Sequence, residues 1–329
     1  MKILLVGGVG YLGLNGVVYH SRHNDEVYVV TRRASIGKRP RIYRIVVDRA
    51  RKVIVLPRLD EERYVKELVA DIGCPRLAYL LVGRLTGTPS QLYESNTYIP
   101  EVWGEGLMES CSETTIVFAS SVLALGDPQR CAADGIVYEE EFHLAGCRQL
   151  SDAGRSKAEG ERRLLRLCRD YGGRVALFRL GLLAGRGAYH REWGILYKLA
   201  RRRILLNSGL NIHLTPASDV FGFARSFIRG SRSSGELPAC GWFNIAPWRL
   251  QLKKLHMLVA DSLSKTKYML RLPLPEALAA KAFPPEISVQ SRYTIRSRYV
   301  SVNAYPWREP GEAIREVVEW CISHGGCLP

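Results

Sequence analysis

MKILLVGGVGYLG, residues 1–13, joins an apolar run to glycines at every third position. The run Ile3 to Val6 predicts a buried parallel strand, because such a strand is covered on both faces. Gly7, Gly10 and Gly13 follow directly, which predicts a tight turn and the start of a helix. Because the N–H groups at a helix start attract anions, the stretch predicts a site for the pyrophosphate of a dinucleotide.

The Gly-x-x-Gly-x-x-Gly spacing gives each glycine a task. Gly7 allows the turn, Gly10 lets a pyrophosphate approach the backbone, and Gly13 lets the helix pack on the strand. A second strand, Glu26 to Thr31, arrives about 20 residues later, as in a dinucleotide-binding unit. We expect the following residues at the cofactor: Gly7, Val9, Gly10, Tyr11, Leu12 and Gly13.

The end of the second strand bears on the choice of cofactor. It runs into Arg32 and Arg33, where an acidic residue would bind the ribose 2′-hydroxyl of NAD. Arginine accommodates a 2′-phosphate instead, so the pair favours NADP. NAD remains the alternative, since an arginine here can also stack on adenine.

Apolar runs and amphipathic segments alternate along the first 180 residues. The further predicted strands are Ile42–Val47, Leu77–Val82, Thr114–Ala119 and Arg174–Arg179. Another apolar run, Val53–Leu56, has no definite place in this scheme. The alternation predicts an α/β fold, a doubly wound parallel sheet of the Rossmann type. Residues that follow or end these strands, Asp48, Val82 and Gly83, are added to the cofactor site.

Composition limits the class of protein. The 329 residues are 47% hydrophobic and 24% charged, which is typical of a globular chain. No apolar segment has the length of a membrane span, and Met1 leads straight into a strand, so we expect no signal peptide, no membrane association and a cytoplasmic location. The net charge of +15 is compatible with a solvated basic surface, a phosphate-bearing substrate or, least of all, nucleic acid.

The eight cysteines are widely spaced, and none forms the Cys-x-x-Cys pair of a zinc or redox site. We therefore expect no metal, and we interpret most of the cysteines as small buried apolar residues. Cys321 and Cys327 are the best candidates for a disulfide.

Several later segments carry a family resemblance. They are Ser120–Gly126, Ser151–Glu159, Arg179–Gly185, Ser218–Val220, Phe243–Ile245 and Pro306–Trp307. In this order they resemble the extended short-chain dehydrogenase/reductase superfamily, in its NAD(P)-dependent epimerase/dehydratase branch, over nearly the whole chain. The resemblance implies a dinucleotide-binding domain over 1–180, with a strand near 241–246 returning to it, and a smaller, interleaved substrate domain over mainly 181–329. It also implies a homodimer, formed through the long helices near Asn96 and Lys157, that acts on nucleotide sugars or similar polar substrates.

The resemblance implies a catalytic serine and a Tyr-x-x-x-Lys pair one helical turn apart. Ser121 matches the serine and Lys157 matches the lysine, whereas the tyrosine position holds Ala153. In the family the lysine lowers the tyrosine pKa and holds the nicotinamide ribose, while the phenol exchanges a proton with the substrate. Alanine has no proton to exchange, so the family reaction cannot run here unchanged.

Three interpretations of Ala153 stay open. It is an engineered Tyr→Ala substitution, a natural change in an enzyme that takes its proton elsewhere, or the mark of a non-catalytic NAD(P)-binding regulatory or scaffold protein. The other donors considered are Tyr138, His143, Asp152 and water. An RNA-binding member of the family is a further alternative, which would show steeply salt-dependent binding. Whether the chain is an active enzyme is therefore undecided from sequence.

For the substrate, the resemblance points to polar and basic residues beyond the sixth strand and at two earlier strand ends. Arginine suits a diphosphate by charge and geometry. The candidates are Arg84, Ser121, Arg186, Tyr189 and His190.

Overall fold

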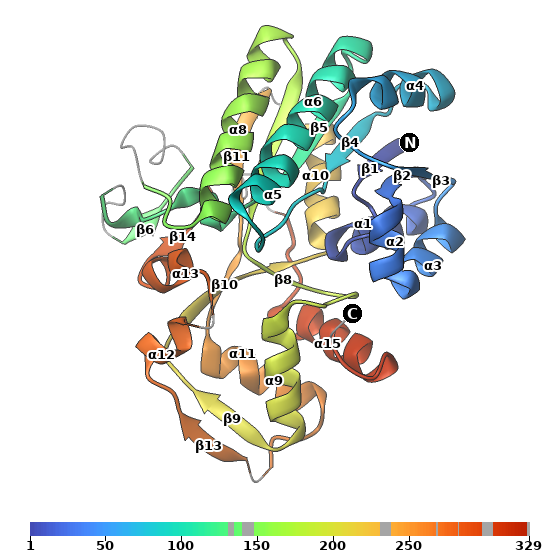
Figure 1. Cartoon of the computed structure of the whole chain (residues 1–329). Helices are drawn as coiled ribbons and strands as arrows, with labels where there is room; N and C mark the ends of the chain where they lie inside the picture. The colour runs from blue at the N-terminus through green and yellow to red at the C-terminus, as the bar shows by residue number, and fades with distance from the viewer. Residues whose placement is uncertain are drawn as a thin grey trace.

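The computed structural model describes residues 1–130, 135–139, 148–230, 238–267, 269–281, 283–297 and 305–327. Its main feature is a parallel sheet of seven strands in the order β11-β7-β5-β4-β1-β2-β3 (Figure 1). The strands are β1 (Lys2–Val6), β2 (Glu26–Arg32), β3 (Lys52–Leu56), β4 (Leu77–Leu80), β5 (Thr115–Ser121), β7 (Arg174–Leu180) and β11 (Cys240–Ile245). The order reverses between β1 and β4, which is where doubly wound sheets bind ligands.

Helices cover both faces of this sheet, as the apolar run of β1 predicts. Ile3 and Leu5 point into a core shared with α1 (Tyr11–Arg22), α3 (Pro40–Arg49) and α10 (Asp219–Gly230). Leu4 and Val6 point into the opposite core, shared with α4 (Glu62–Ile72), α6 (Ile99–Ser110) and α8 (Asp152–Asp170). The alternation along one strand therefore builds two cores, and the doubly wound prediction is confirmed.

The predicted third strand is wrong. Residues Ile42–Val47 lie in the helix α3, and the third strand is β3, parallel to β2 with Tyr28 opposite Lys52. Pro40 occupies the first turn of α3, a position that suits proline. Ile42 and Val46 are buried while Val47 is 44% exposed, so the apolar run has helical rather than strand periodicity. Asp48 consequently lies exposed near the end of a helix, not after a strand.

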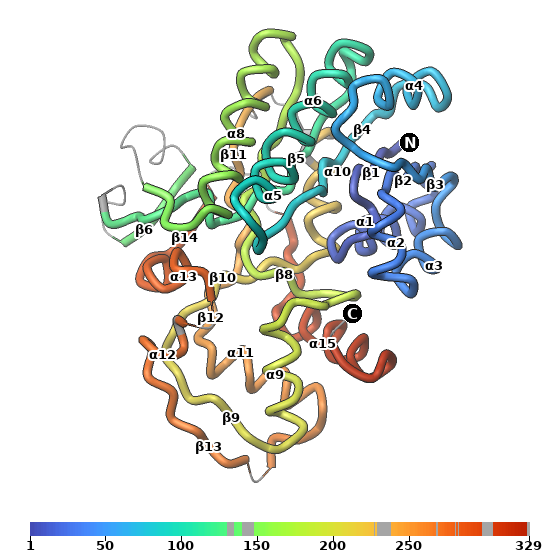
Figure 2. Tube along the Cα trace, viewed as in Figure 1, coloured from blue at the N-terminus to red at the C-terminus, as the bar shows by residue number. Residues whose placement is uncertain are grey.

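The second half forms smaller sheets around its own core. β8 (Leu182–Ala184), β10 (Asn211–Pro216) and β12 (Trp248–Gln251) form one sheet. β9 (Ile204–Asn207) pairs with β13 (Leu270–Pro273) in a two-stranded parallel sheet. They pack with α9 (Arg191–Arg201), α11 (Leu252–Ser262) and α15 (Pro310–Ser323). β11 pairs with β7 at the edge of the large sheet, and β12 of the smaller sheet follows it in the chain (Figure 2).

Several short elements complete the fold. They are α2 (Arg33–Lys38), α5 (Pro89–Tyr93), the π-helical turn Glu94–Tyr98, β6 (Ile136–Val137), α12 (Glu276–Ala280), α13 (Pro285–Gln290) and β14 (Thr294–Ile295). None of the helices that the structure describes has the length and apolar character needed to cross a bilayer.

Six of the eight cysteines form disulfides within the described residues. The predicted pair Cys321–Cys327 is confirmed. Cys74–Cys111 and Cys168–Cys240 are also bonded, so the interpretation of these cysteines as reduced apolar residues is wrong. The Cys168–Cys240 bond joins α8 to the start of β11.

Candidate functional site

The glycine turn has the geometry expected of a phosphate cradle. Gly7 has φ of +88°, a left-handed conformation that favours glycine, and a Cβ on it would lie 2.9 Å from the Val82 nitrogen. A Cβ on Gly13 would lie 2.3 Å from the Gly8 carbonyl oxygen, so the helix needs glycine to pack here. A Cβ on Gly10 would meet only the Gly7 oxygen, at 3.3 Å. Gly10 thus leaves space in front of the start of α1.

The other residues of the turn contribute through their backbone. Val9 and Leu12 are buried in the core below the sheet. The buried Tyr11 hydroxyl donates to the carbonyl oxygens of Leu183 and Gly185, so it is engaged by the second half of the chain. The first N–H groups of a helix have no hydrogen-bond partner within the helix, so those of α1 are the donors available to an anion.

Lys157 lies where the carboxyl ends of β4 and β5 meet. Its side chain is 4% exposed, its Nζ donates to the Ala119 carbonyl oxygen at 2.7 Å, and it lies 4.6 Å from the Phe118 ring centroid. A Cβ on Gly83 would approach Nζ to 2.7 Å, so glycine leaves the amine room there. Burial lowers the pKa of Lys157 to about 7, partly opposed by the nearby Glu161 carboxylate.

Ser121 is the last residue of β5 and is partly exposed. Its Oγ accepts a hydrogen bond from the Leu123 nitrogen at 3.3 Å and caps a short 3₁₀ turn. Ser121 and Lys157 therefore lie at the same end of the sheet.

Ala153 has an apolar environment. It is 4% exposed and packs with Leu92 and Leu123, with Ile287 of α13 against the same cluster. The tyrosine position thus carries no ionisable group, and aliphatic side chains surround it. Among the residues that the structure describes, the apolar neighbours of Ala153 carry no exchangeable proton.

The helix α13 is a part of the site that sequence reasoning missed. Glu286 is fully buried, and its Oε1 accepts from the nitrogens of Leu150 and Ser151 and from Ser151 Oγ, at 3.2, 2.7 and 2.6 Å. Gln290 donates to the carbonyl oxygens of Val122 and Gly126. These bonds fasten α13 to the start of α8 and to the turn after Ser121.

Asn96 has a structural task. Its amide accepts from the Arg84 nitrogen at 2.9 Å and donates to the Arg84 oxygen at 2.8 Å and to Ser156 Oγ at 2.9 Å. It lies in the π-helical turn, a feature that is frequent at functional sites. Asn96 therefore fixes the loop after β4, with Gly83 and Arg84, against α8.

A buried ion pair lies one helical turn from Lys157. Glu161, one turn further along α8, accepts from Arg179 Nε and Nη2 at 3.0 and 2.6 Å, with both side chains at most 3% exposed. Ser120 Oγ donates to the same carboxylate at 2.5 Å, and Trp242 Nε1 donates at 3.1 Å. The network joins α8 to three neighbouring strands of the sheet.

The predicted arginine pair, Arg32 and Arg33, lies at the surface at the end of β2. Arg32 is partly exposed and lies 3.7 Å from a Glu94 oxygen, and Arg33 is exposed at the start of α2. Arg39, which the sequence analysis did not select, donates to the Val9 oxygen of the glycine turn at 3.3 Å and lies 4.4 Å over the Tyr189 ring. Asp48, on the exposed end of α3, does not follow a strand as predicted.

The expected substrate residues lie at different places in the structure. Arg84 is held beside Gly83, near Lys157. Tyr189 and His190 contact the Tyr11 ring, with centroid distances of 5.9 and 5.2 Å, on the side of the glycine turn. Burial lowers the pKa of His190 to about 4, so the ring is neutral. Arg186 is directed to Glu316 of α15, at 3.6 Å.

The alternative proton donors lie in different surroundings. Asp152 pairs with Arg155 on the exposed face of α8. Tyr138 follows β6, beside a cluster that includes Val122 and Leu125. His143 lies outside the described residues. In the described part of the chain, no group of three or more His, Cys, Asp or Glu side chains is placed to bind a metal.

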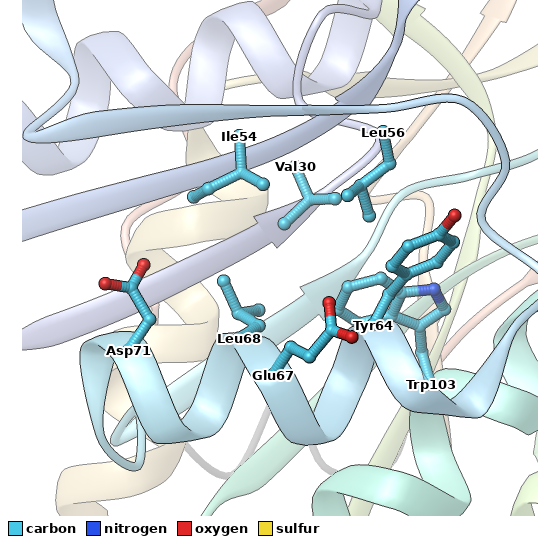
Figure 3. Close-up of a pocket in the computed structure, with 8 residues that line it drawn as sticks. All are labelled: Val30, Ile54, Leu56, Tyr64, Glu67, Leu68, Asp71 and Trp103. Carbon is cyan, nitrogen blue, oxygen red and sulfur yellow. The ribbon is translucent and has the colours of Figure 1, made fainter.

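A separate cavity of about 240 Å³ lies between β2, β3 and α4 (Figure 3). It is lined by Val30, Ile54, Leu56, Tyr64, Glu67, Leu68, Asp71 and Trp103. None of these residues belongs to the candidate site, so the cavity is not part of it.

Comparison with known proteins connects this geometry to a family. Residues 3–219 match the family model described as "NAD dependent epimerase/dehydratase family". No curated protein sequence gives a significant match.

Solved structures of this kind share the fold at low identity. The enzyme WbmG of Bordetella bronchiseptica, in complex with NAD and UDP, is 16% identical with a TM-score of 0.73, over 99% of this chain and 96% of that one. UDP-glucose 4-epimerase of Thermotoga maritima with UDP-glucose is 15% identical, with a TM-score of 0.70, over 98% and 99%. The dTDP-glucose 4,6-dehydratase of Bacillus anthracis in complex with NAD is 16% identical, with a TM-score of 0.71, over 100% and 98%.

Proposed function

The chain belongs to the NAD-dependent epimerase/dehydratase family, and from this premise we propose that it binds NADP or NAD and acts on a nucleotide sugar or a related polar substrate. The observation that carries the proposal is the buried Lys157 amine beneath Gly83, at the same end of the sheet as Ser121 and the glycine turn. A lysine is retained in a dry site at considerable free-energy cost, which is typical of functional positions.

The glycine turn fits a dinucleotide. The space in front of Gly10, which a side chain would fill, matches a pyrophosphate, and the N–H groups of α1 match its charge. Arg32, Arg33 and Arg39 supply positive charge beside the turn, which favours NADP over NAD. When bound, the nicotinamide supplies hydride transfer.

The residues of this chain position the cofactor and the substrate. Lys157 Nζ lies beside Gly83, where it would donate to ribose hydroxyls, and the Ala119 carbonyl and Phe118 ring orient its amine. Ser121, at the end of β5, would hold the substrate oxygen. Asn96 holds the Gly83–Arg84 loop in place beside Lys157 and Ser121.

The proton donor is not assigned to residue 153. Redox chemistry at a hydroxyl or ketone needs a proton to leave or arrive at the oxygen, and Ala153 has none to exchange. An active enzyme would therefore take its proton from another source, with water, Tyr138, His143 and Asp152 as the candidates. The packing of Ala153 against Leu92 and Leu123 favours a second candidate function, a non-catalytic dinucleotide-binding protein.

Cofactor binding is tested with the purified protein. We expect that denaturation releases NADP or NAD, identified by mass spectrometry, or that titrated NADPH binds more tightly than NADH. Gly10→Val should abolish binding without unfolding the protein, because only the Gly7 oxygen is near the new Cβ. Gly37→Val is the matched control, since nothing lies within 4 Å of its Cβ. Equal binding by both variants would reject the cradle.

Catalysis is tested separately. The protein, loaded with NAD or NADP, is incubated with UDP- and dTDP-sugars in ²H₂O, and products and deuterium incorporation are followed by NMR. Turnover that Lys157→Met abolishes supports the enzyme. Cofactor binding without any turnover or exchange favours the non-catalytic candidate. The homodimer through α6 and α8 and the cytoplasmic location are parts of the same proposal.

A further inference from the structure

The two-stranded sheet β9–β13 forms an exposed basic tip with leucines at its surface. Figures 1 and 2 show it at the end of the molecule remote from α6 and α8, the helices of the proposed dimer. All four residues of β13 are exposed, and Leu270 and Leu272, on one side of the strand, are 68% and 46% exposed. Leu278 on the following helix, α12, is 53% exposed.

Cations surround these leucines because of the topology. β9 and β13 are parallel, so the segments that lead into them, from the ends of α9 and α11, converge at the same place. The Leu270 nitrogen donates to the Arg203 oxygen at 2.8 Å, which brings the two segments into contact. The cations of the tip are Arg201, Arg202, Arg203, Lys265, Lys267 and Arg271.

The charge of the tip is not neutralised locally. Within the part of the chain that the structure describes, none of these six cations has a carboxylate partner within 4.0 Å. Residues 197–206 and 261–273 hold seven Lys and Arg but one acidic residue, Asp261. Arg201 lies over the Tyr197 ring, at 5.8 Å from its centroid, with its charge free for another group.

We propose that this tip binds the surface of an anionic lipid bilayer. Leucines enter the boundary between headgroups and acyl chains while surrounding Lys and Arg bind anionic headgroups, a combination that suits a membrane surface. A partner strand is a poorer occupant, because β13 is short and carries Arg271 and Pro273, which oppose edge pairing. Single-stranded nucleic acid is a poorer occupant too, since leucines offer no stacking surface.

The proposal revises the expectation of no membrane association. That expectation was based on the lack of a long apolar segment, whereas the tip is assembled from residues about 65 positions apart in the chain. It does not depend on the reaction proposed above, because the tip is separate from Ser121 and Lys157.

Vesicle sedimentation tests the tip. We expect the full-length protein to bind phosphatidylcholine vesicles that contain phosphatidylglycerol, and to bind pure phosphatidylcholine weakly. Leu270→Ser with Leu272→Ser should lower the partition coefficient at least about tenfold, because two apolar side chains leave the bilayer boundary. Arg202→Gln with Arg271→Gln should lower it by about tenfold at low salt and less at high salt.

Ile322→Ser is the matched control, since Ile322 is 56% exposed on α15 and should bind like wild type. Thermal unfolding confirms that each variant is folded. We expect all of them to fold, because the substituted side chains are exposed. The proposal is overturned if the protein does not bind anionic vesicles, or if the leucine variant and the control bind equally. It is also overturned if the leucine variant instead loses self-association or RNA binding that wild type shows, because the tip would then serve another macromolecule.

Discussion

Replacing Glu161 by glutamine should destabilise the protein strongly. The carboxylate holds Arg179 through two nitrogens, and the side chains of this pair are 2% and 3% exposed. Glu161→Gln keeps the shape but leaves the guanidinium charge buried without its counter-ion. Breaking a buried pair in this way lowers the free energy of unfolding by about 3–5 kcal/mol. The bond from Ser120 Oγ to the carboxylate is weakened as well.

A second Glu–Arg pair, which joins α8 to α6, provides the control. Arg163 pairs with Glu101, but these side chains are 27% and 23% exposed, and Arg163 keeps Glu159 as a second partner. Water and Glu159 compensate for the lost charge, so Glu101→Gln should lower the free energy of unfolding by less than about 1 kcal/mol. Urea denaturation followed by tryptophan fluorescence gives both values under the same conditions.

The difference in burial accounts for the whole expected difference in the free energy of unfolding. If Glu101→Gln and Glu161→Gln change the free energy of unfolding by equal amounts, burial does not control the strength of these pairs.

Three further perturbations test other parts of the structure. Replacing Cys168 and Cys240 by alanine should lower the free energy of unfolding by about 4 kcal/mol and replacing Cys321 and Cys327 by about 2 kcal/mol, because the bonds close loops of 72 and 6 residues; the reverse order in urea denaturation would contradict this. Burial lowers the pKa of His256 to about 4, so the unfolded state takes up a proton first and stability falls as pH decreases from about 6.5 to about 4. His256→Gln should reduce that loss, measured as Tm against pH, and an unchanged profile would reject it. The pKa of Lys157 is about 7 when folded, so between about pH 7 and about pH 10.5 the unfolded state binds more protons than the folded state. The buried amine therefore destabilises the protein at pH 7, and Lys157→Met should raise the free energy of unfolding there by several kcal/mol. A lower free energy of unfolding in urea denaturation would contradict this.

Local features of the fold were predictable from sequence because they depend on nearby residues. The glycine turn combines a strand, a change of direction and a helix within thirteen residues, and its positive φ at Gly7 requires a glycine. The prediction for Ile42–Val47 is wrong because a short run of apolar residues suits a strand as well as a helix, and only Pro40 before it indicates a helix start.

The candidate site was only partly predictable, because its walls come from distant segments. Ser121 and Lys157 were recognised by motif, but the contact of Glu286 with Ser151 joins residues 135 positions apart. Arg39 reaches the glycine turn only through the fold of α2 and α3. The pairing of Cys168 with Cys240 likewise depends on β11 returning to the sheet.

That return of β11 has a consequence for synthesis of the chain. Phe243 and Ile245 complete the core of the large sheet, and β7 has a free edge until they arrive. A nascent chain therefore cannot complete the seven-stranded sheet until about 245 residues have left the ribosome. During that interval the edge of β7 is open to pairing with another chain. A fragment that ends after Leu180 would keep this open edge permanently, so we expect it to aggregate rather than to fold as an independent nucleotide-binding unit.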